Sequence, residues 1–308
     1  MKNEMSVAMI EQRAGKGAAR AAARKRKDKH QSWGSSRRPG IVTYIVLGVV
    51  LLLSAYPLYF AFLLASSDAQ TIAQNPIPSL IPGKNLFSNV NAVLHSDINF
   101  WLATWNSIIV STITAISVVF FSTLAGFAFS KLHFRGRGPL LAFIVGTMAV
   151  PTQLGIVPLF ILMSALGWTG KLVAVIVPVM VTAFGVFWMT QYLRDALPFE
   201  LIEAARVDGA TLMRTFWFVV LPAARPAATM LALFTFVGQW TNFFWPFIVL
   251  GSSNPTLPVA LQLLQASYFK DYSLIMAGVV VATAPLILLF IFAGRQLVSG
   301  IMQGAVKG

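Results

Sequence analysis

Residues 194–225 form the only charged stretch of any length between two long apolar runs, and they hold the pattern that could do chemistry. The pattern is Glu203-Ala204-Ala205, then Gly209, then Leu221-Pro222. The Glu203 carboxylate can form an ion pair, and the two alanines beside it let another surface approach closely. The alternative is a pair on the helix surface between Glu203 and Arg206, worth about 0.2–0.5 kcal/mol.

Two short helices must hold this pattern in place. Pro198 suits a first helical turn, where its missing N–H costs nothing, so the first helix is expected over about 199–208. Gly209 suits the left-handed conformation that stops a helix. Thr211 can cap a second helix of about ten residues, and we expect Pro222 to end it. Such a pair can act as a stiff lever for a partner protein, or lie as an amphipathic pair on lipid headgroups.

The composition indicates what kind of protein surrounds this segment. Of the 308 residues, 57% are hydrophobic and 11% are charged, against roughly 25% charged in soluble globular domains. The net charge of +13 comes mainly from the first 38 residues, which hold 11 Lys and Arg against three acids. These values exclude an ordinary soluble enzyme, a disordered protein and a nucleic-acid-binding domain of the usual kind. They indicate a membrane protein whose partners include the lipid bilayer and no nucleic acid.

Six runs of the sequence lack Asp, Glu, Lys and Arg and reach the length of about 20 residues that a helix needs to cross the hydrocarbon core. They do not show the alternating polarity of a β-barrel. We therefore predict an all-α integral membrane protein with six transmembrane helices in a domain of residues 41–294. The predicted spans are about 41–65, 102–130, 139–166, 172–193, 226–250 and 274–294.

Lys and Arg are distributed unequally over alternate loops, twenty on one side and three on the other. Because positive charge collects on the cytoplasmic side, we expect both termini and the loop 194–225 to be cytoplasmic. The basic tail 1–40 is expected to be disordered, or alternatively to lie on anionic headgroups. Arg37-Arg38 loosely resembles a twin-arginine signal, but the apolar run that follows is longer than a signal peptide contains. The other cytoplasmic end is the C-terminal tail 295–308.

Two external segments are long enough to do more than turn. Residues 66–101 contain three prolines, and residues 251–273 begin with the turn residues Gly251-Ser252-Ser253-Asn254-Pro255. The second segment continues with Leu261 to Leu264, so it predicts either an interfacial helix or a loop that reaches a partner.

The sequence offers little material for catalysis. It contains no cysteine, its three histidines lie far apart, and it has no Gly-x4-Gly-Lys-Ser/Thr phosphate loop. An intramembrane enzyme would need an acidic, histidine or cysteine constellation at membrane depth. A secondary transporter would need ionisable residues within the spans to couple protons or sodium. The predicted spans contain neither, so both classes are disfavoured, and no metal site or catalytic residue is expected.

The spacing of the loop 194–225 resembles the signature loop of ABC importer permease subunits. After Glu203-Ala204-Ala205 and Gly209, a β-branched residue, Val219, precedes Leu221-Pro222 by one position, and Asp208-Gly209-Ala210 matches the form common in the sugar-importing branch. The run 240–246 is similar to the Trp-x-Asn-aromatic segment of carbohydrate permeases. The ending 300–308 resembles the tail of the smaller maltose-permease subunit. The resemblance covers roughly 40–308 and implies the type I ABC importer permease fold.

The resemblance implies roles for the residues that match the pattern. Glu203 would pair with an arginine of a cytoplasmic ATPase, Gly209 would be the hinge between two coupling helices, and Ala204 and Ala205 would form the close-packing face. Asp208, Leu221 and Pro222 complete the coupling loop. The C-terminal tail would contact the ATPase through Gln303, Gly304, Ala305, Val306 and Lys307, unless it is a frayed terminus.

The resemblance also implies an assembly. This chain would be a non-catalytic half of the translocation path in a bacterial cell membrane. Its partners would be a homologous second permease, two ATPase subunits and an extracellular solute-binding protein, whose ligand pocket the segment 251–273 would enter. ATP and Mg would belong to the ATPase, so no cofactor is expected in this chain.

The sequence also suggests which residues line the translocation path and which solute it carries. Amides and aromatic faces recognise sugars, which makes Gln153, Gln239, Trp240, Asn242 and Phe243 candidates, although polar residues in spans also hydrogen-bond between helices. The stretch Tyr268 to Ser273 and the C-terminal ending look like permeases for β-linked disaccharides such as cellobiose or chitobiose. A glycerol phosphate permease is the nearer alternative. Since a phosphate would favour basic residues along the path, their absence from the spans favours a neutral sugar.

Overall fold

The structure is a computed structural model that describes residues 40–305 except 76, 78 and 268–270. Side chains are described as far as Phe292, together with Gly294. The predicted basic tail therefore lies outside the described residues, apart from Gly40. So do Val306, Lys307 and the side chains of Gln303 to Ala305.

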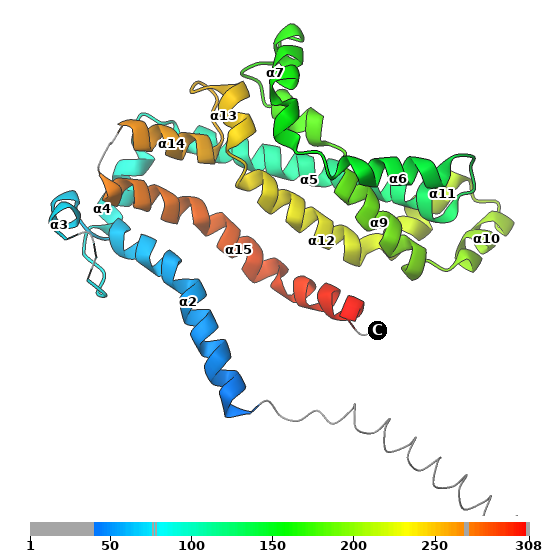
Figure 1. Cartoon of the computed structure of the whole chain (residues 1–308), viewed down its shortest axis with the longest axis horizontal. Coiled ribbons are helices and arrows are strands. Elements are labelled where there is room, and N and C mark those ends of the chain that lie inside the picture. Colours follow the sequence, from blue (N-terminus) through cyan, green and yellow to red (C-terminus); the bar gives the residue numbers. More distant parts are fainter. Residues whose placement is uncertain (1–39, 76, 78, 268–270, 306–308) are drawn as a thin grey trace, which may run out of the picture. The chain divides into compact units, whose positions relative to one another are not determined.

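The described residues are helical and contain no strand, as predicted (Figure 1). The chain divides into two compact units at Pro57, which lies inside α2. The helices, in chain order, are α2 (Ile41–Ala65), α3 (Ala69–Gln74), α4 (Leu86–Leu94), α5 (Phe100–Lys131), α6 (Arg137–Thr147), α7 (Ile156–Ala165), α8 (Val173–Ile176), α9 (Ala183–Ala196), α10 (Phe199–Val207), α11 (Leu212–Thr215), α12 (Leu221–Trp240), α13 (Phe244–Leu250), α14 (Leu257–Ser267) and α15 (Tyr272–Ala305). Two 3-10 turns, η1 (Thr152–Gly155) and η2 (Val177–Val179), and one π-helical turn, η3 (Phe216–Val220), join some of these helices.

Four helical stretches in the described part of the chain are long and apolar enough to cross a membrane: Ile41–Ala65, Phe100–Lys131, Leu212–Trp240 and Tyr272–Phe292. Two further pairs pass the same test but are bent. Arg137–Thr147 and Thr152–Ala165 meet at 89°, and Val173–Val179 and Ala183–Ala196 meet at 42°. If each bent pair is one span, the total is six.

Proline explains where the bent pairs break, because it lacks the N–H that continues a helix. Pro151 precedes η1 at the 89° bend, and Pro178 lies in η2 at the 42° bend. The predicted run 226–250 is also interrupted: α12 ends at Trp240 and α13 starts at Phe244. Pro246 in α13 cannot donate to the carbonyl four residues earlier.

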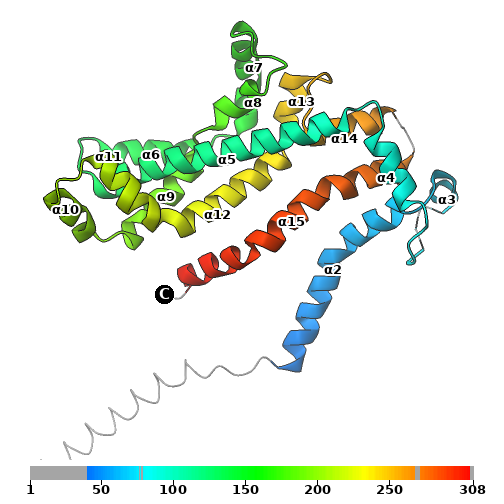
Figure 2. The same ribbon diagram turned by 180° about the vertical axis from the view of Figure 1, so that it is seen from behind.

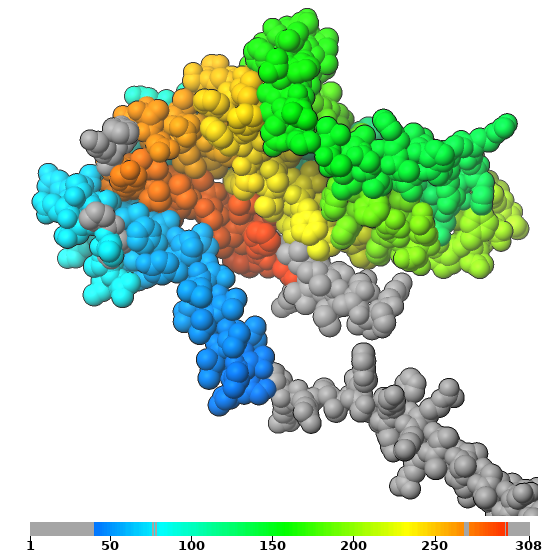
Figure 3. All heavy atoms as spheres, in the orientation of Figure 1, coloured from blue at the N-terminus to red at the C-terminus, as the bar shows by residue number. Residues whose placement is uncertain are grey.

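The second unit is built on α5, which packs against α9 and α12. Figures 1 and 2 both show these helices side by side, with α7 rising away from them. In the space-filling view (Figure 3), the same projection stands out from the rest of this unit. The hydrophobic cluster shared by α5, α9 and α12 contains Val118, Phe127, Met189, Phe216 and Leu231, each at most 3% exposed.

Two glycines allow α5 and α9 to cross closely. A Cβ on Gly126 would lie 2.8 Å from the backbone carbonyl carbon of Met189, and one on Gly185 would meet Ser122 Oγ. Small residues at helix crossings are typical of membrane proteins, where close packing replaces the hydrophobic effect. The crossing therefore fixes α9 against α5, and α9 leads directly into the loop that holds Glu203.

Candidate functional site

The inner face of α10 anchors the loop 194–225 to the core of the second unit. Ile202 is fully buried and belongs to the α5–α9–α12 cluster, and Ala205, three positions later, is 9% exposed. Residues three and four apart lie on the same face of a helix. Ala205 therefore packs into its own chain, which differs from the expectation that it shares a docking face with Ala204.

The outer face of α10 is open. Glu203, Ala204 and Asp208 are exposed, and Val207 is 88% exposed. The pair between Glu203 and Arg206 that the spacing allows is not formed, and no other described residue pairs with the Glu203 carboxylate. A carboxylate beside an alanine and an exposed valine is thus left available on a helix whose other face is fixed.

Gly209 ends α10 in the way the sequence predicts. Its φ of +76° lies in the left-handed region. Its N–H donates to the Arg206 carbonyl at 3.0 Å, and the Ala210 N–H donates to the Ala205 carbonyl at 2.9 Å. This pair of bonds is the Schellman motif, which satisfies the last carbonyls of a helix. The turn between the two helices is therefore defined by hydrogen bonds as well as by the glycine.

The second helix of the loop begins as expected and ends differently. Thr211 Oγ1 accepts a hydrogen bond from the Arg214 N–H at 3.3 Å and so caps α11. The prediction that Pro222 ends this helix is wrong, because the helix continues through η3 into α12. The Leu221 N–H bonds to the Phe216 carbonyl, one residue further back than in an α-helix. This π turn and the position of Pro222 in the first turn of α12 accommodate the missing N–H.

The continuous helix from α11 to α12 joins the loop 194–225 to the membrane helices. Phe216 is fully buried and meets the ring of Phe120 in α5 edge-on at 5.9 Å. The segment Leu212–Trp240 is one helical stretch that starts three residues after Gly209 and ends at the buried Trp240. α11, η3 and α12 are therefore continuous, and only Asp208 to Thr211 separate α10 from this helical stretch. Leu221 and Pro222 belong to that helix rather than to a separate loop.

The predicted C-terminal contact residues are described only in part. The backbone of Gln303, Gly304 and Ala305 continues α15 as a helix. Val306 and Lys307 lie outside the described residues. Their contact with an ATPase remains a prediction.

The structure brings together three of the five path candidates, at the break between α12 and α13. Asn242 Nδ2 donates to Gln239 Oε1 at 3.4 Å, and Phe243 follows and stacks on Phe247 with ring centroids 5.0 Å apart. All three candidates are half-buried. Gln153 is exposed on a different element, η1.

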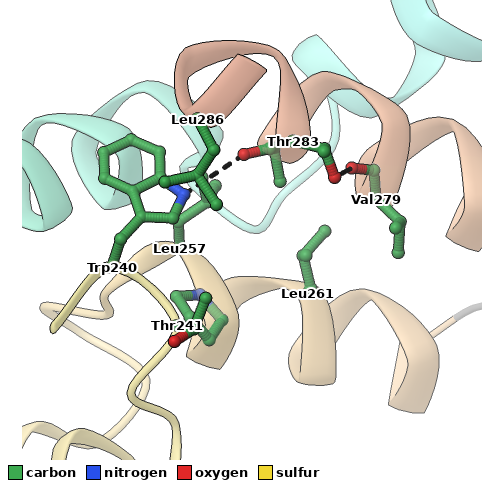
Figure 4. A pocket seen from close by; sticks show the side chains of 9 residues that line it. Trp240, Thr241, Leu257, Leu261, Val279, Thr283 and Leu286 are labelled. Carbon is green, nitrogen blue, oxygen red and sulfur yellow. Dashed lines mark hydrogen bonds between the residues drawn. The ribbon is translucent and has the colours of Figure 1, made fainter. Parts of the chain in front are cut away.

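Trp240, the fifth path candidate, is directed into the protein. It is 3% exposed, and its indole N–H donates to the Ala282 carbonyl of α15 at 3.2 Å (Figure 4). It lines a cavity of about 230 Å³ together with Leu257, Leu261 and Leu286. Thr283 Oγ1, also in the wall, already donates to the Val279 carbonyl. With its polar groups engaged inside the chain, this cavity offers little to a sugar hydroxyl.

Sequence reasoning missed an anchor that holds the segment 251–273, which is predicted to be external. Ser107 Oγ in α5 accepts a hydrogen bond from the Leu257 N–H at 2.8 Å, at the start of α14. Asn254 Nδ2 donates to the Gly170 carbonyl at 3.0 Å, and the Gly170 N–H donates to the Val249 carbonyl at 2.8 Å. One signal was present, because Asn106 is the only Asn or Gln in the predicted span 102–130.

The described residues hold no group of three or more His, Cys, Asp or Glu side chains that could bind a metal ion. The segment Glu203 to Thr211, called the lever below, is mostly exposed and leads through α11 and η3 into α12. Residues 119–299 match the family described as the binding-protein-dependent transport system inner membrane component. The chain belongs to this family. This matched region includes the lever and all of α9–α14.

Curated members of the family cover much of the chain. The arabinooligosaccharide transport permease AraQ of Halalkalibacterium halodurans is 34% identical over 68% of this chain and 75% of its own length. The lactose transport permease LacG of Rhizobium radiobacter is 30% identical over 88% of this chain and 97% of its own. The sn-glycerol-3-phosphate transport permease UgpE of Yersinia enterocolitica is 27% identical over 84% of this chain and 94% of its own length.

A solved structure shares the fold. A chain of a bacterial ABC transporter involved in the import of the acidic polysaccharide alginate superposes with a TM-score of 0.71 at 25% identity. The match covers 85% of this chain and 97% of the other. The chain is thus an inner-membrane component of an ABC transporter with the permease fold expected from its sequence.

Proposed function

We propose that this chain is one transmembrane subunit of an ATP-driven importer of a neutral disaccharide or oligosaccharide. The observation that carries the proposal is the lever at Gly209. One face of α10 is anchored to the core through Ile202, while the other presents Glu203, which pairs with none of the described residues. The helical stretch that begins at Leu212 runs into α12 without a break. Force applied to Glu203 from the cytoplasm would therefore move a membrane span.

The proposed assembly follows from the family. An inner-membrane component of a binding-protein-dependent system works with an external binding protein and an ATPase. We propose two ATPase subunits, which hold ATP and Mg, and a homologous second permease that completes the path. In this arrangement both termini and the loop 194–225 are cytoplasmic, the C-terminal tail 303–307 contacts the ATPase, and this chain hydrolyses nothing itself.

The proposed cargo rests on the relatives and on the charge-free spans. Two of the relatives carry names of sugar permeases, for arabinooligosaccharides and lactose. The predicted spans hold no Lys or Arg that would bind a phosphate or a carboxylate. Gln239, Asn242 and Phe243 supply the amides and the aromatic face that suit a neutral sugar. Cellobiose and chitobiose are the first disaccharides to test.

The second candidate is a permease for glycerol phosphate. It is favoured by the similarity to UgpE over 94% of that protein. The two cargoes differ in charge, so a single uptake experiment separates them.

The experiment is uptake into proteoliposomes that contain the complete complex. Labelled cellobiose, chitobiose and glycerol 3-phosphate are offered with the binding protein outside and with ATP and Mg inside. We expect uptake of a neutral sugar that stops when ATP is omitted. Uptake of glycerol 3-phosphate alone would move the assignment to the second candidate. Uptake that needs a proton or sodium gradient instead of ATP would overturn the proposal in favour of a secondary transporter.

A further inference from the structure

Lys131, the last residue of α5, is a buried cation outside every role described above. Its side chain is 9% exposed, and its Nζ donates to the backbone carbonyl of Arg194 at 3.0 Å. The two residues are 63 positions apart. A lysine is rarely buried unless it is paired, so this contact needs a structural reason.

The reason is a carbonyl that the chain cannot satisfy on its own. In α9 the Leu197 N–H bonds to the Leu193 carbonyl. The next bond of the same ladder would join residue 198 to Arg194, but residue 198 is a proline and has no N–H. Pro198 is also the N-cap residue of α10, which begins at Phe199. The start of α10 thus creates the free acceptor that Lys131 fills.

Charge strengthens the same contact. The C-terminal end of α9 carries the negative end of its helix dipole, which favours a cation there. The carboxylates of Asp195 and Glu200 attract the Lys131 ammonium, while Arg194 and Arg137 oppose it. Glu200 lies in the first turn of α10. The dipole of α9 therefore favours a cation at this position, and Glu200 brings a carboxylate from the first turn of α10.

The chain beyond α5 is fixed as well. Arg137 Nη1, at the start of α6, donates to the Leu132 carbonyl at 3.0 Å, one residue after Lys131. Two cations thus cap the ends of two helices at one junction. The backbone on both sides of Lys131 is held while its side chain reaches α9.

We propose that Lys131 is a positioning residue that ties α5 to the α9–α10 junction, so that α10 moves with these helices rather than independently of them. The proposal rests on the function proposed above, in which an ATPase pushes on α10. Without the tie, Ile202 would still hold α10 to the core, but the junction before Pro198 could shift, and part of the displacement of α10 would not reach the spans. The expected defect is therefore in coupling, meaning sugar transported per ATP hydrolysed.

The test uses the reconstituted complex with three variants. Lys131→Met removes the donor and the charge at similar length, Lys131→Arg keeps both, and Lys84→Met is the control at an exposed lysine of the external segment 66–101. We expect Lys131→Met to lower transport per ATP about tenfold, the factor set by one lost charge-assisted hydrogen bond. We expect Lys131→Arg to keep most of the coupling, and Lys84→Met to keep all of it.

A double variant separates positioning from simple stabilisation. Pro198→Ala supplies an N–H for the Arg194 carbonyl, so it should restore the amount of folded Lys131→Met protein but not its coupling. Recovery of coupling in the Lys131→Met, Pro198→Ala variant would overturn the proposal and leave Lys131 as a helix cap. Coupling in Lys131→Met equal to that of the wild type would overturn it too. If the wild-type complex itself shows no ATP-driven uptake, the proposed function fails instead.

Distance measurements test the tie without turnover. The sequence has no cysteine, so spin labels can be placed at Arg135→Cys and Val207→Cys, both exposed sites on either side of the junction. The tie predicts a narrow distance distribution in the otherwise wild-type chain and a broader one with Lys131→Met. Identical distributions in folded protein would contradict the proposal even where transport has changed.

Discussion

Asn106 and Asn254 are joined side chain to side chain across 148 positions, with Asn106 Nδ2 donating to Asn254 Oδ1 at 2.8 Å. The same Nδ2 donates to the Pro255 carbonyl at 2.9 Å. Asn106 lies in the first third of α5 and is 4% exposed. The bond therefore connects the helix at the centre of the second unit with the start of the segment 251–273.

Asn106→Leu should loosen that segment while leaving the membrane helices in place. It leaves the buried Pro255 carbonyl without this donor, at a cost of about 1–3 kcal/mol, and the half-buried Asn254 Oδ1 loses the same donor. If the segment contacts the binding protein, as proposed, the variant should lose stimulation of ATP hydrolysis by the binding protein but keep the basal rate. The measurement is ATPase activity of the complex with and without loaded binding protein. Gln74→Ala, at an exposed external site, is the control; unchanged stimulation in Asn106→Leu would remove the anchor from the mechanism.

Glu203→Ala should uncouple the complex without unfolding this chain. The side chain is exposed and has no partner among the described residues, so its loss costs the isolated subunit little. If an arginine of the ATPase pairs with it, the loss of that pair should weaken docking about tenfold or more. The readouts are copurification of the ATPase and the transport rate. Asp97→Asn, at an exposed site in the predicted external segment 66–101, is the matched carboxylate control. Normal copurification and transport in Glu203→Ala would contradict the assignment.

The fold class and the lever were predictable because they rest on local chemistry. Charge-free runs fix the helical membrane class, and Gly209 with Thr211 fixes the turn, since a left-handed stop and an N-cap are properties of single residues. The ending at Pro222 was not predictable in the same way. Proline is compatible both with a helix stop and with a first turn after a π bulge, and the sequence does not distinguish the two; in the structure the helix continues, and Phe216 in the π turn packs against Phe120 of α5.

The tertiary contacts of the site could not be read from the sequence at all. The expected packing role of Ala205 required knowing which face of α10 meets the core, and Ile202 settles it only in three dimensions. The path candidates were chosen by residue type. Trp240 matched by type, yet its N–H is used by Ala282. Long-range pairs such as Lys131 with Arg194 leave no periodic trace in the sequence.

Substitution of Gly209 should damage coupling in proportion to the strain it introduces. At φ +76°, a residue with a Cβ costs about 1–2 kcal/mol, and asparagine less than other residues. We expect transport in the order wild type, Gly209→Asn, Gly209→Ala, Gly209→Val. Since a Cβ there meets no atom within 4 Å, the ranking would reflect backbone conformation and not collision. Equal transport by the asparagine and valine variants would show that the left-handed turn is not required.

Gly126→Ala should destabilise the crossing of α5 and α9. Its Cβ would approach the Met189 backbone within 2.8 Å, and a backbone cannot move aside as a flexible side chain can. Overpacking of this kind costs about 1–3 kcal/mol, so the purified subunit should show a lower thermal unfolding midpoint and less folded protein after extraction. Gly146→Ala is the matched control, because a Cβ there meets nothing within 4 Å. If both variants unfold at the wild-type temperature, α5 and α9 do not cross as closely as their backbones indicate, and the rigid support inferred for α10 is lost with that crossing.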